Sequence, residues 1–374
     1  MNIHCMGFEF DLRGWAYWPE REDLSIEFMR LLGAAQEGGS AVAECCVAAS
    51  RIDCSDDSSW HREWKRIADV SCERGNAALA HGNLLTAKSN WLRAIGYYQS
   101  AAFPFDPTDD NYRVAIARMQ ECARNYLRHL KPAGEVVQIT WPGGYPLEAY
   151  FLPAPDAVGR APALICIGEP GRRKEEYLYK IARYASERGI SLLAVDLFGA
   201  GADAQFEQAV GRFDLEMTIA HIMDYLVERD DVDAERVVIL ADGWGSSFVA
   251  RGIAFDDRFA AAVCDGGIWD LHERAFLLSR LDLPNANLDA RRAFNKVGRN
   301  IKCPVLVAMG EQGWLEAERV RDMVDDLKAE GCEMTLKIFT TEETASAQAH
   351  ADNPTLANEF IFDWIGARLR LNQL

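Results

Sequence analysis

The sequence has little of what marks membrane, secreted or nucleic-acid-binding proteins. None of its apolar runs approaches the ~20 residues needed to span a bilayer. The start of the chain has no basic segment followed by an apolar one, so no signal peptide is predicted. Lys and Arg number 40 against 57 Asp and Glu, a net charge of −17. Because nucleic acids and anionic membranes are bound by basic patches, neither is expected as a partner.

Disulfide and metal-binding patterns are also missing. The 10 cysteines include no CxxC pair, and Cys45 and Cys46 are adjacent. We therefore expect reduced, mostly buried thiols in a cytoplasmic protein. The 7 histidines form no HExxH motif and no two-His spacing. No metal site is predicted, and no cofactor is implied.

The composition that is present is that of a globular protein with room for two domains. Hydrophobic residues make up 49% and charged residues 26% of 374 positions, which argues against disorder. In residues 1–135, apolar side chains recur at helical spacing, which predicts a helical domain. The expected helices cover residues 24–35, 41–52, 60–79, 84–102 and 111–130.

Residues 136–374 have a different pattern. Two alternating segments, 136–141 and 147–151, flank Pro142-Gly143-Gly144 and predict a β-hairpin. Short apolar runs then alternate with helical segments, which predicts a mostly parallel sheet covered on both faces. The expected strands are 163–167, 191–195, 237–240, 260–264, 305–309 and 334–339, and the expected helices are 175–188, 213–228, 246–255, 315–330 and 354–371.

A hairpin that enters such a sheet is typical of the α/β-hydrolase fold. The segment of about 268–300 has no strand pattern and lies where that fold often inserts lid helices. In this fold the nucleophile stands at a strand-to-helix elbow written G-x-S-x-G. Here the expected strand 237–240 runs into Ala241-Asp242-Gly243-Trp244-Gly245. The spacing and the small flanking residues fit, but the nucleophile position is glycine.

Several further motifs, in their order, resemble the FrsA-like group of α/β-hydrolases. They begin at Gly168, Ala194, Ala250, Gly266 and Ala351, and they read GEPGRRKEE, AVDLFGAG, ARGIAFDDRF, GGIWD and ADNPTLAN. The resemblance covers most of residues 136–374 and implies a helical N-terminal domain that forms part of a lid. Members of the group include polyketide chain-shortening hydrolases of the fungal Ayg type and a pseudooxynicotine hydrolase.

The resemblance also implies a Ser-Asp-His triad, and the sequence departs from it at every member. Gly243 stands at the serine, Gly313 at the acid and Gln348 at the histidine position. Since a triad acts as a unit, the three replacements together indicate that serine chemistry is absent. The oxyanion donors could persist, as the backbone N–H of Trp244 and one from the loop 168–171 that starts at Gly168.

Other side chains are candidates for proton transfer. Glu169 lies on the loop expected to face the oxyanion, and His350 lies two residues after Gln348. His272 and Asp270 lie where the lid segment begins. Each has a structural alternative: a solvated glutamate, a surface or structural histidine, or an aspartate that caps a lid helix.

Polar residues near the elbow and the strand ends are weaker candidates. Asp242 precedes the elbow centre, and its side chain is expected to point away. Ser246 and Ser247 open the following helix, so packing at the helix start is the favoured interpretation. Asp196 ends a strand and is expected to fix the turn after it.

Three tryptophans indicate the kind of ligand. In this fold Trp244, Trp269 and Trp314 fall on loops that rim the pocket. Either they are unrelated core residues, or, with Asp242, they line a cavity for a flat aromatic or ketone substrate.

These patterns support three hypotheses on function. The leading one is a cofactor-independent, non-hydrolytic enzyme of specialised metabolism, which binds an aromatic or β-dicarbonyl small molecule. It would stabilise an enolate or oxyanion during cyclisation, elimination or C–C bond change, with His350, His272 or Glu169 moving protons. The alternatives are a hydrolase with a relocated nucleophile and a non-catalytic binding or scaffold protein. The sequence leaves the oligomeric state open, a homodimer included.

Overall fold

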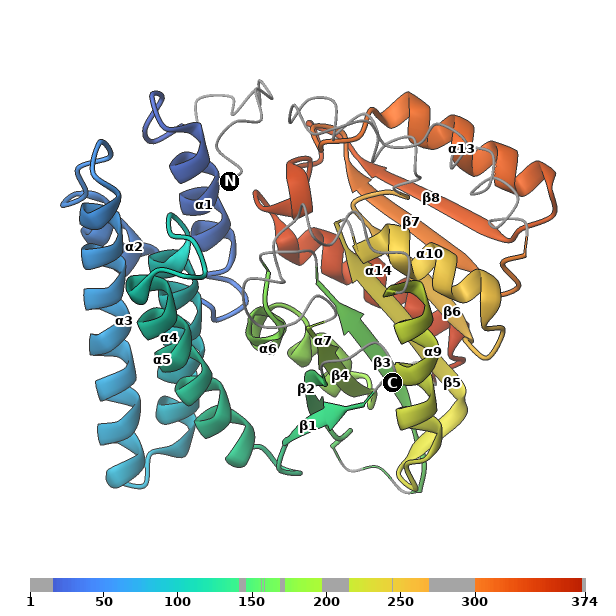
Figure 1. The fold of residues 1–374 in the computed structure, drawn as a ribbon, viewed down its shortest axis with the longest axis horizontal. Helices are drawn as coiled ribbons and strands as arrows, with labels where there is room; N and C mark the ends of the chain where they lie inside the picture. The colour runs from blue at the N-terminus through green and yellow to red at the C-terminus, as the bar shows by residue number, and fades with distance from the viewer. Residues whose placement is uncertain are drawn as a thin grey trace. The chain divides into compact units, whose positions relative to one another are not determined.

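The computed structural model describes residues 16–140, 146–155, 157, 159–168, 172–196, 215–243, 245–268 and 300–371. The chain divides into two compact units (Figure 1). The helical unit contains residues 1–135 together with 175–183 and 351–355, and the sheet unit contains 136–174, 184–350 and 356–374.

Five helices form the front of the chain, as the periodicity predicts. They are α1 (Glu22–Gly33), α2 (Val42–Ala49), α3 (Asp57–Ala80), α4 (Leu84–Ala102) and α5 (Asp110–Arg128). Aromatic side chains fill the space between them, and Trp60, Trp64 and Tyr97 are fully buried. The ring centroids lie 5.6 Å apart for Trp60 and Trp64, and 6.0 Å apart for Trp64 and Tyr97. This aromatic cluster is the core of the helical unit.

The main chains of this unit approach closely at glycines. A Cβ on Gly96 of α4 would lie 2.1 Å from the carbonyl oxygen of Gly39. A Cβ on Gly75 of α3 would lie 2.7 Å from Nε1 of Trp91. Neither position has room for a side chain, so these two glycines set the distance between the packed segments.

A buried ionic network ties the segment 175–183 to the helices. The Arg30 guanidinium of α1 donates to Glu27 at 2.8 Å and to the Tyr179 hydroxyl at 3.0 Å. It also lies 3.6 Å from the Glu176 carboxylate. All four side chains are buried, so their charges and polar atoms are satisfied mainly by one another.

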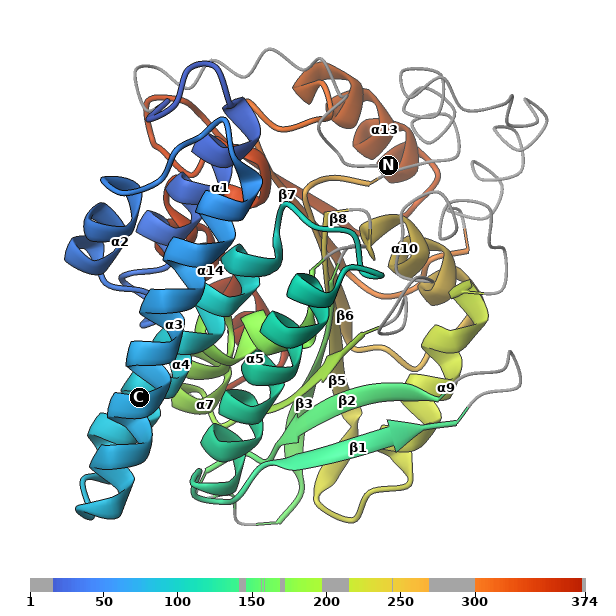
Figure 2. The same ribbon diagram turned by 60° about the vertical axis from the view of Figure 1, so that its left-hand side comes forward.

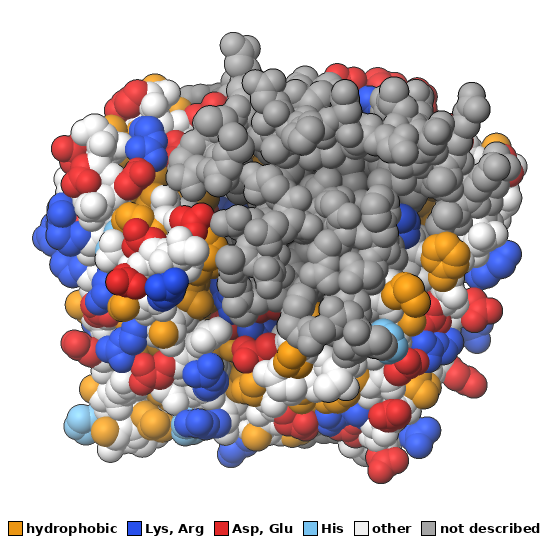
Figure 3. Space-filling model, viewed as in Figure 1, with side chains coloured by type: hydrophobic (Ala, Val, Ile, Leu, Met, Phe, Trp, Pro, Cys, Tyr) orange, Lys and Arg blue, Asp and Glu red, His pale blue; other side chains and the backbone are white. Residues whose placement is uncertain are grey.

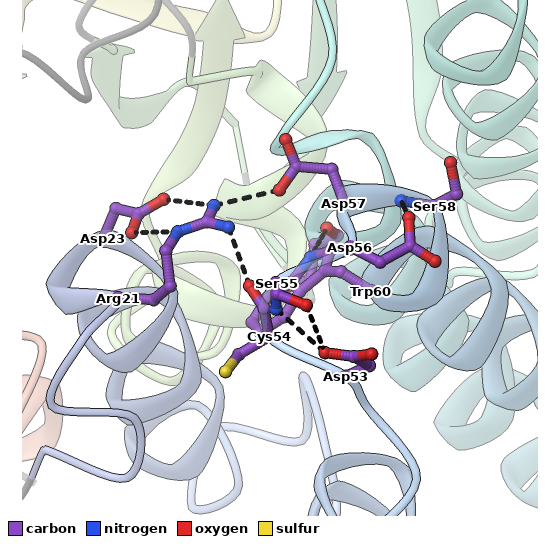
Figure 4. A network of polar contacts seen from close by, with 10 residues as sticks. Arg21, Asp23, Asp53, Cys54, Ser55, Asp56, Asp57, Ser58 and Trp60 are labelled. Carbon is purple, nitrogen blue, oxygen red and sulfur yellow. Dashed lines mark hydrogen bonds and ion pairs between the residues drawn. The ribbon is translucent and has the colours of Figure 1, made fainter.

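The start of α3 is capped by side chains of its own loop (Figure 4). The Asp56 carboxylate accepts a hydrogen bond from the backbone N–H of Ser58 at 2.9 Å. The Arg21 guanidinium joins the two helix starts, since it donates to Asp23 of α1 and Asp57 of α3, each at 2.9 Å. It also donates to the carbonyl of Cys54 at 2.9 Å.

Replacing this cap should weaken the helical unit by a measurable amount. We expect Asp56→Ala to lower the free energy of unfolding by ~1 kcal/mol, because an orphan N–H of the first turn loses its acceptor. Urea denaturation followed by circular dichroism measures the change. Asp110→Ala is the control, since the Asp110 side chain is 94% exposed and its ion pair with Arg113 should contribute little. Equal stability of Asp56→Ala and wild type would contradict this account of the cap.

An eight-stranded sheet forms the second unit, with the order β1-β2-β4-β3-β5-β6-β7-β8. Its strands are β1 (Glu135–Ile139), β2 (Leu147–Leu152), β3 (Ala161–Ile167), β4 (Ser191–Val195), β5 (Val232–Asp242), β6 (Ala261–Asp265), β7 (Val305–Gly310) and β8 (Met334–Phe339). β2 is antiparallel to β4, and the pairs from β4 through β8 are parallel. The predicted mostly parallel sheet is therefore confirmed.

Helices cover both faces of this sheet (Figures 1 and 2). The helices α9 (Leu215–Val227) and α10 (Gly245–Phe255) pack together on one face. On the other face, α7 (Ala182–Glu187) meets α14 (Pro354–Arg368) through stacked Tyr184 and Phe362 rings, 5.3 Å apart. The helix α13 (Ala317–Ala329) packs against β8. Two-sided cover explains why β3, β4, β6 and β7 are buried along their whole length.

The single helix predicted for residues 175–188 is wrong. The chain forms three short pieces there: the 3₁₀ turn η2 (Lys174–Glu176), α6 (Tyr177–Lys180) and α7. All four residues of α6 are buried. Because every residue of η2 and α6 is buried, rather than one helical stripe, packing overrides the local helical preference there.

The cysteines and the surface complete the description. Every cysteine in the described ranges is a free thiol, and most are buried, as predicted. In the described part of the chain, no helix combines the length and the apolar character needed to cross a membrane. On the coloured part of the face in Figure 3, acidic and basic side chains are interspersed.

Candidate active site

The predicted elbow is present, and glycine stands at its apex. β5 ends at Asp242 and α10 begins at Gly245. Between them Gly243 has a φ of +51°, in the left-handed region, and its N–H donates to the carbonyl of Asp265 at 2.6 Å. This is the sharp strand-to-helix turn on which the fold presents a serine. Here the turn is retained and the apex has no side chain.

Small residues bring three strand ends together at this point. A Cβ on Gly245 would lie 3.1 Å from the carbonyl oxygen of Gly168, just after β3. A Cβ on Gly266, just after β6, would lie 3.0 Å from the Cα of Gly243. The carboxyl ends of β3, β5 and β6 therefore converge, and sites of open parallel sheets form at such an edge.

A buried histidine–aspartate pair occupies the same edge. Nε2 of His350 lies 2.7 Å from Oδ1 of Asp265, and the two residues are 2% and 3% exposed. Nδ1 of His350 lies 2.6 Å from the carbonyl oxygen of Ala345. Since a carbonyl oxygen only accepts, Nδ1 carries a proton. The 2.7 Å contact then holds one further proton between the imidazole and the carboxylate.

The loop that holds His350 has a strained backbone. Four non-glycine residues between β8 and α14 have positive φ angles: Thr344 (72°), Ala345 (57°), Ala349 (54°) and His350 (54°). Left-handed conformations at such residues cost ~1–2 kcal/mol each. Strain of this kind persists only where the surroundings impose it, and it is concentrated at functional sites.

The two other positions implied for the triad are neighbours in the structure. The backbone N–H of Trp314 donates to Oε1 of Gln348 at 2.9 Å. A Cβ on Gly313 would lie 3.1 Å from the same oxygen. Their equivalence to a catalytic acid and base stays a prediction, but neither residue can ionise. Among the residues described at this edge, Asp265 and His350 are the pair that can exchange protons.

The serines that open α10 are packing residues. Ser246 is fully buried, and its hydroxyl donates to the carbonyls of Ala241 and Asp265 at 3.2 and 3.3 Å. The Ser247 hydroxyl accepts from Arg251 at 3.3 Å. Burial raises the pKa of the neighbouring Cys264 thiol well above its usual range. That cysteine is therefore a thiol rather than a reactive thiolate at neutral pH.

Asp196 binds the main chain and the side chain of Lys174. Its carboxylate accepts from the backbone N–H of Lys174 at 2.7 Å and from Lys174 Nζ at 2.8 Å. The same ammonium group, fully buried, lies 2.8 Å from Glu148 of β2. The described contacts of Asp196 thus fix the chain after the loop 168–171, and the turn that Asp196 is predicted to fix lies outside the described residues.

The structure places only part of the predicted site. Asp242 is buried at the end of β5, and Trp314 is half-buried. In the described ranges, no group of three or more His, Cys, Asp and Glu side chains is arranged to hold a metal ion. Residues 269–299, most of the segment predicted to form a lid, lie outside the described residues, with Trp269, Asp270 and His272. Glu169 and Trp244 also lie outside them.

Sequence reasoning missed Asp265. It is the last residue of the buried strand β6 and precedes Gly266 and Gly267, both with positive φ. An acidic residue at the carboxyl end of a buried parallel strand, followed by two glycines, is the signal that could have identified it.

The family comparison agrees with this geometry. The model of the family described as Esterase FrsA-like matches residues 54–292, more than half of the chain. The chain belongs to the FrsA-like family. Among solved structures, the FrsA-like fold here is similar to 2,6-dihydroxy-pseudo-oxynicotine hydrolase, with a TM-score of 0.71 and 19% identity over 90% of this chain and 95% of the other. That likeness shows the shared α/β-hydrolase fold.

Curated relatives come from fungi. The chain is 30% identical to "Hydrolyase poxO" of Penicillium oxalicum over 261 residues, which is 67% of this chain and 62% of the relative. It is 27% identical to "20-hydroxy-prefusarin hydrolase FUS2" of Gibberella moniliformis, over 67% of this chain and 61% of the relative. The matches therefore span about three-fifths of the relatives' length. This FrsA-like chain is therefore related to proteins that are named as enzymes.

Proposed function

We propose that the protein is a non-hydrolytic, cofactor-independent enzyme that moves protons on an aromatic or β-dicarbonyl substrate. The observation that carries the proposal is the buried His350–Asp265 pair at the elbow, 2.7 Å between Nε2 and Oδ1. The pair lies at the carboxyl ends of the parallel strands, where active sites of this fold form, and the apex residue Gly243 offers no nucleophile. Proton removal next to a carbonyl gives an enolate, from which cyclisation, elimination or C–C bond change can follow.

The pair acts as one acid–base unit. Both imidazole nitrogens already face an oxygen, one of Ala345 and one of Asp265. With the shared proton on Nε2, the Asp265 carboxylate takes the substrate proton and becomes a carboxylic acid, and the adjacent imidazolium balances the charge of the enolate that forms. Burial keeps water away from both groups, so their interaction is stronger than it would be in solvent.

The enolate oxygen needs hydrogen-bond donors in turn. The predicted donors are the backbone N–H of Trp244 and one from the loop that starts at Gly168. Trp314 and the predicted Trp244 and Trp269 would hold a flat substrate. The proton-moving roles assigned to His272 and Glu169 are secondary in this proposal, since the described geometry supports the His350–Asp265 pair.

Hydrolysis with a relocated nucleophile is the second candidate, because several relatives are named hydrolases. The name "Hydrolyase" of another relative supports elimination instead. A non-catalytic binding role is the third.

Exchange of α-protons tests the leading proposal directly. A simple aryl ketone such as acetophenone in D₂O loses its α-proton signals in NMR as enolisation proceeds. We expect the wild type to accelerate this exchange, and His350→Gln and Asp265→Asn each to lower the rate by ~10²-fold or more. His221→Gln is the matched control, since that histidine lies on α9 with a third of its side chain exposed.

The outcomes separate the hypotheses. A wild type that exchanges no faster than buffer contradicts the proposed proton chemistry. Exchange that survives in both His350→Gln and Asp265→Asn contradicts the assignment of the acid–base unit.

A further inference from the structure

We infer that Gln348 binds the substrate: its side-chain amide donates a hydrogen bond to the substrate oxygen that becomes negative in the reaction. The inference rests on the proposed function for the identity of that oxygen, a carbonyl on its way to an enolate. It assigns a binding role to a position that the family resemblance describes only as the place of a missing base.

The orientation of the amide is fixed. The backbone N–H of Trp314 can only donate, and it lies 2.9 Å from Oε1 of Gln348. The reversed amide would place N–H₂ against N–H, two donors facing each other. The amide oxygen therefore faces the backbone N–H of Trp314, and the amide nitrogen Nε2 points away from that N–H.

The amide nitrogen of Gln348 is buried and lacks an acceptor among the described residues. Nε2 of Gln348 is shielded from solvent and has no hydrogen-bond partner within the part of the chain that the structure describes. Buried donors are nearly always paired, and an unpaired one destabilises the protein. An acceptor supplied by a bound molecule would satisfy these two N–H groups.

The position of Gln348 fits an acceptor on the substrate. It begins the turn η4 (Gln348–His350), which also carries His350 to its contact with Asp265. Gln348 and His350 are thus on one short, strained turn. A substrate with its α-proton at Asp265 and its carbonyl oxygen at the Gln348 amide would have the arrangement that stabilises an enolate.

Gly313 leaves room for this arrangement. A Cβ at Gly313 would already lie 3.1 Å from Oε1 of Gln348. An aspartate there would press on the amide and bring a carboxylate against Oε1, two acceptors facing each other, which favours the reversed amide with its N–H groups on that carboxylate. Glycine at 313 and glutamine at 348 are therefore complementary: the missing acid keeps the amide donor available to a ligand.

Binding of an enolate mimic tests the inference without turnover. The probe is 4-nitrophenol at a mildly alkaline pH, where it is a flat aromatic phenolate. Nitrobenzene is the matched probe without the oxygen anion, and calorimetry measures both dissociation constants. Gln348→Met keeps the side-chain length and removes the donor. We expect it to raise the Kd of the phenolate by ~10-fold or more, because hydrogen bonds to charged groups are the stronger ones, and to leave that of nitrobenzene within ~2-fold.

Controls keep the outcomes distinct. Gln312→Met is the control variant, in the loop between β7 and α13 that also holds Gly313 and Trp314, and it should bind both probes as the wild type does. Circular dichroism checks that each variant folds. Unchanged phenolate affinity in Gln348→Met, or a wild type that does not bind the phenolate, overturns the inference. A selective loss of phenolate binding together with no α-proton exchange in the wild type would support the Gln348 site while rejecting the proposed function.

Discussion

A fluorophosphonate probe should leave the intact mass of the protein unchanged, and hydrolysis of a 4-nitrophenyl ester should stay at background. The apex of the elbow is Gly243, which has no side chain to attack either reagent. Ser246 lies three residues on, but it is fully buried, and its hydroxyl donates to the carbonyls of Ala241 and Asp265. Exposing it would require the first turn of α10 to unwind.

Restoring the serine should not restore esterase activity. In Gly243→Ser the new hydroxyl needs a base, but both nitrogens of His350 already face oxygens. Loss of a complete triad lowers kcat by ~10⁶-fold, and restoring a single member raises kcat by only a small part of that factor. Intact mass and ester hydrolysis measured on both proteins check this. A covalent adduct on Ser246 or Ser247 would make the relocated-nucleophile hydrolase the better hypothesis.

The second large effect concerns the close contact inside the helical unit. Gly96→Ala should destabilise that unit by ~3 kcal/mol or more, because its Cβ would lie 2.1 Å from the carbonyl oxygen of Gly39. The obstacle is backbone, which cannot rotate away as a flexible side chain could. Thermal unfolding followed by circular dichroism and tryptophan fluorescence measures the loss.

A glycine on another helix provides the matched control. A Cβ on Gly366 of α14 would meet only Cδ1 of Leu371, at the ordinary contact distance of 3.9 Å. Gly366→Ala should therefore raise stability by ~0.5–1 kcal/mol through helix propensity alone. If Gly96→Ala and Gly366→Ala shift the melting temperature in the same direction, the close contact does not limit the packing.

Much of the fold follows from patterns within short stretches of sequence. Each of the five front helices and each buried strand has a periodicity of its own, and the elbow is marked by glycines around a strand end. These features depend on local geometry, so they can be predicted without knowing what packs where. The segment 175–188 shows the limit, because residues 175–180 are all buried and its helical pattern breaks.

The site itself depends on distant contacts. His350 and Asp265 are 85 positions apart in the chain. The loop that holds His350 has positive φ angles at Thr344, Ala345 and Ala349. Neither composition nor spacing predicts such angles at these residue types. Gln348 could be found as a departure from a family pattern, but its fixed amide orientation depends on Trp314, 34 positions earlier. The lid roles of the helical unit and of the segment around 268–300 stay predictions.

The buried network around Arg30 also has a consequence for the order of folding during synthesis. Glu27 and Arg30 are made early, but their partners Glu176 and Tyr179 follow nearly 150 residues later, since Arg30 and Tyr179 are 149 positions apart. The helical unit also includes residues 351–355, close to the end of the chain. On the ribosome, the five front helices can form as soon as they emerge, but their most polar interior contacts must wait. The helical unit can thus begin to fold before the sheet unit, but its buried ionic network is completed only after residues 176–179 have been made.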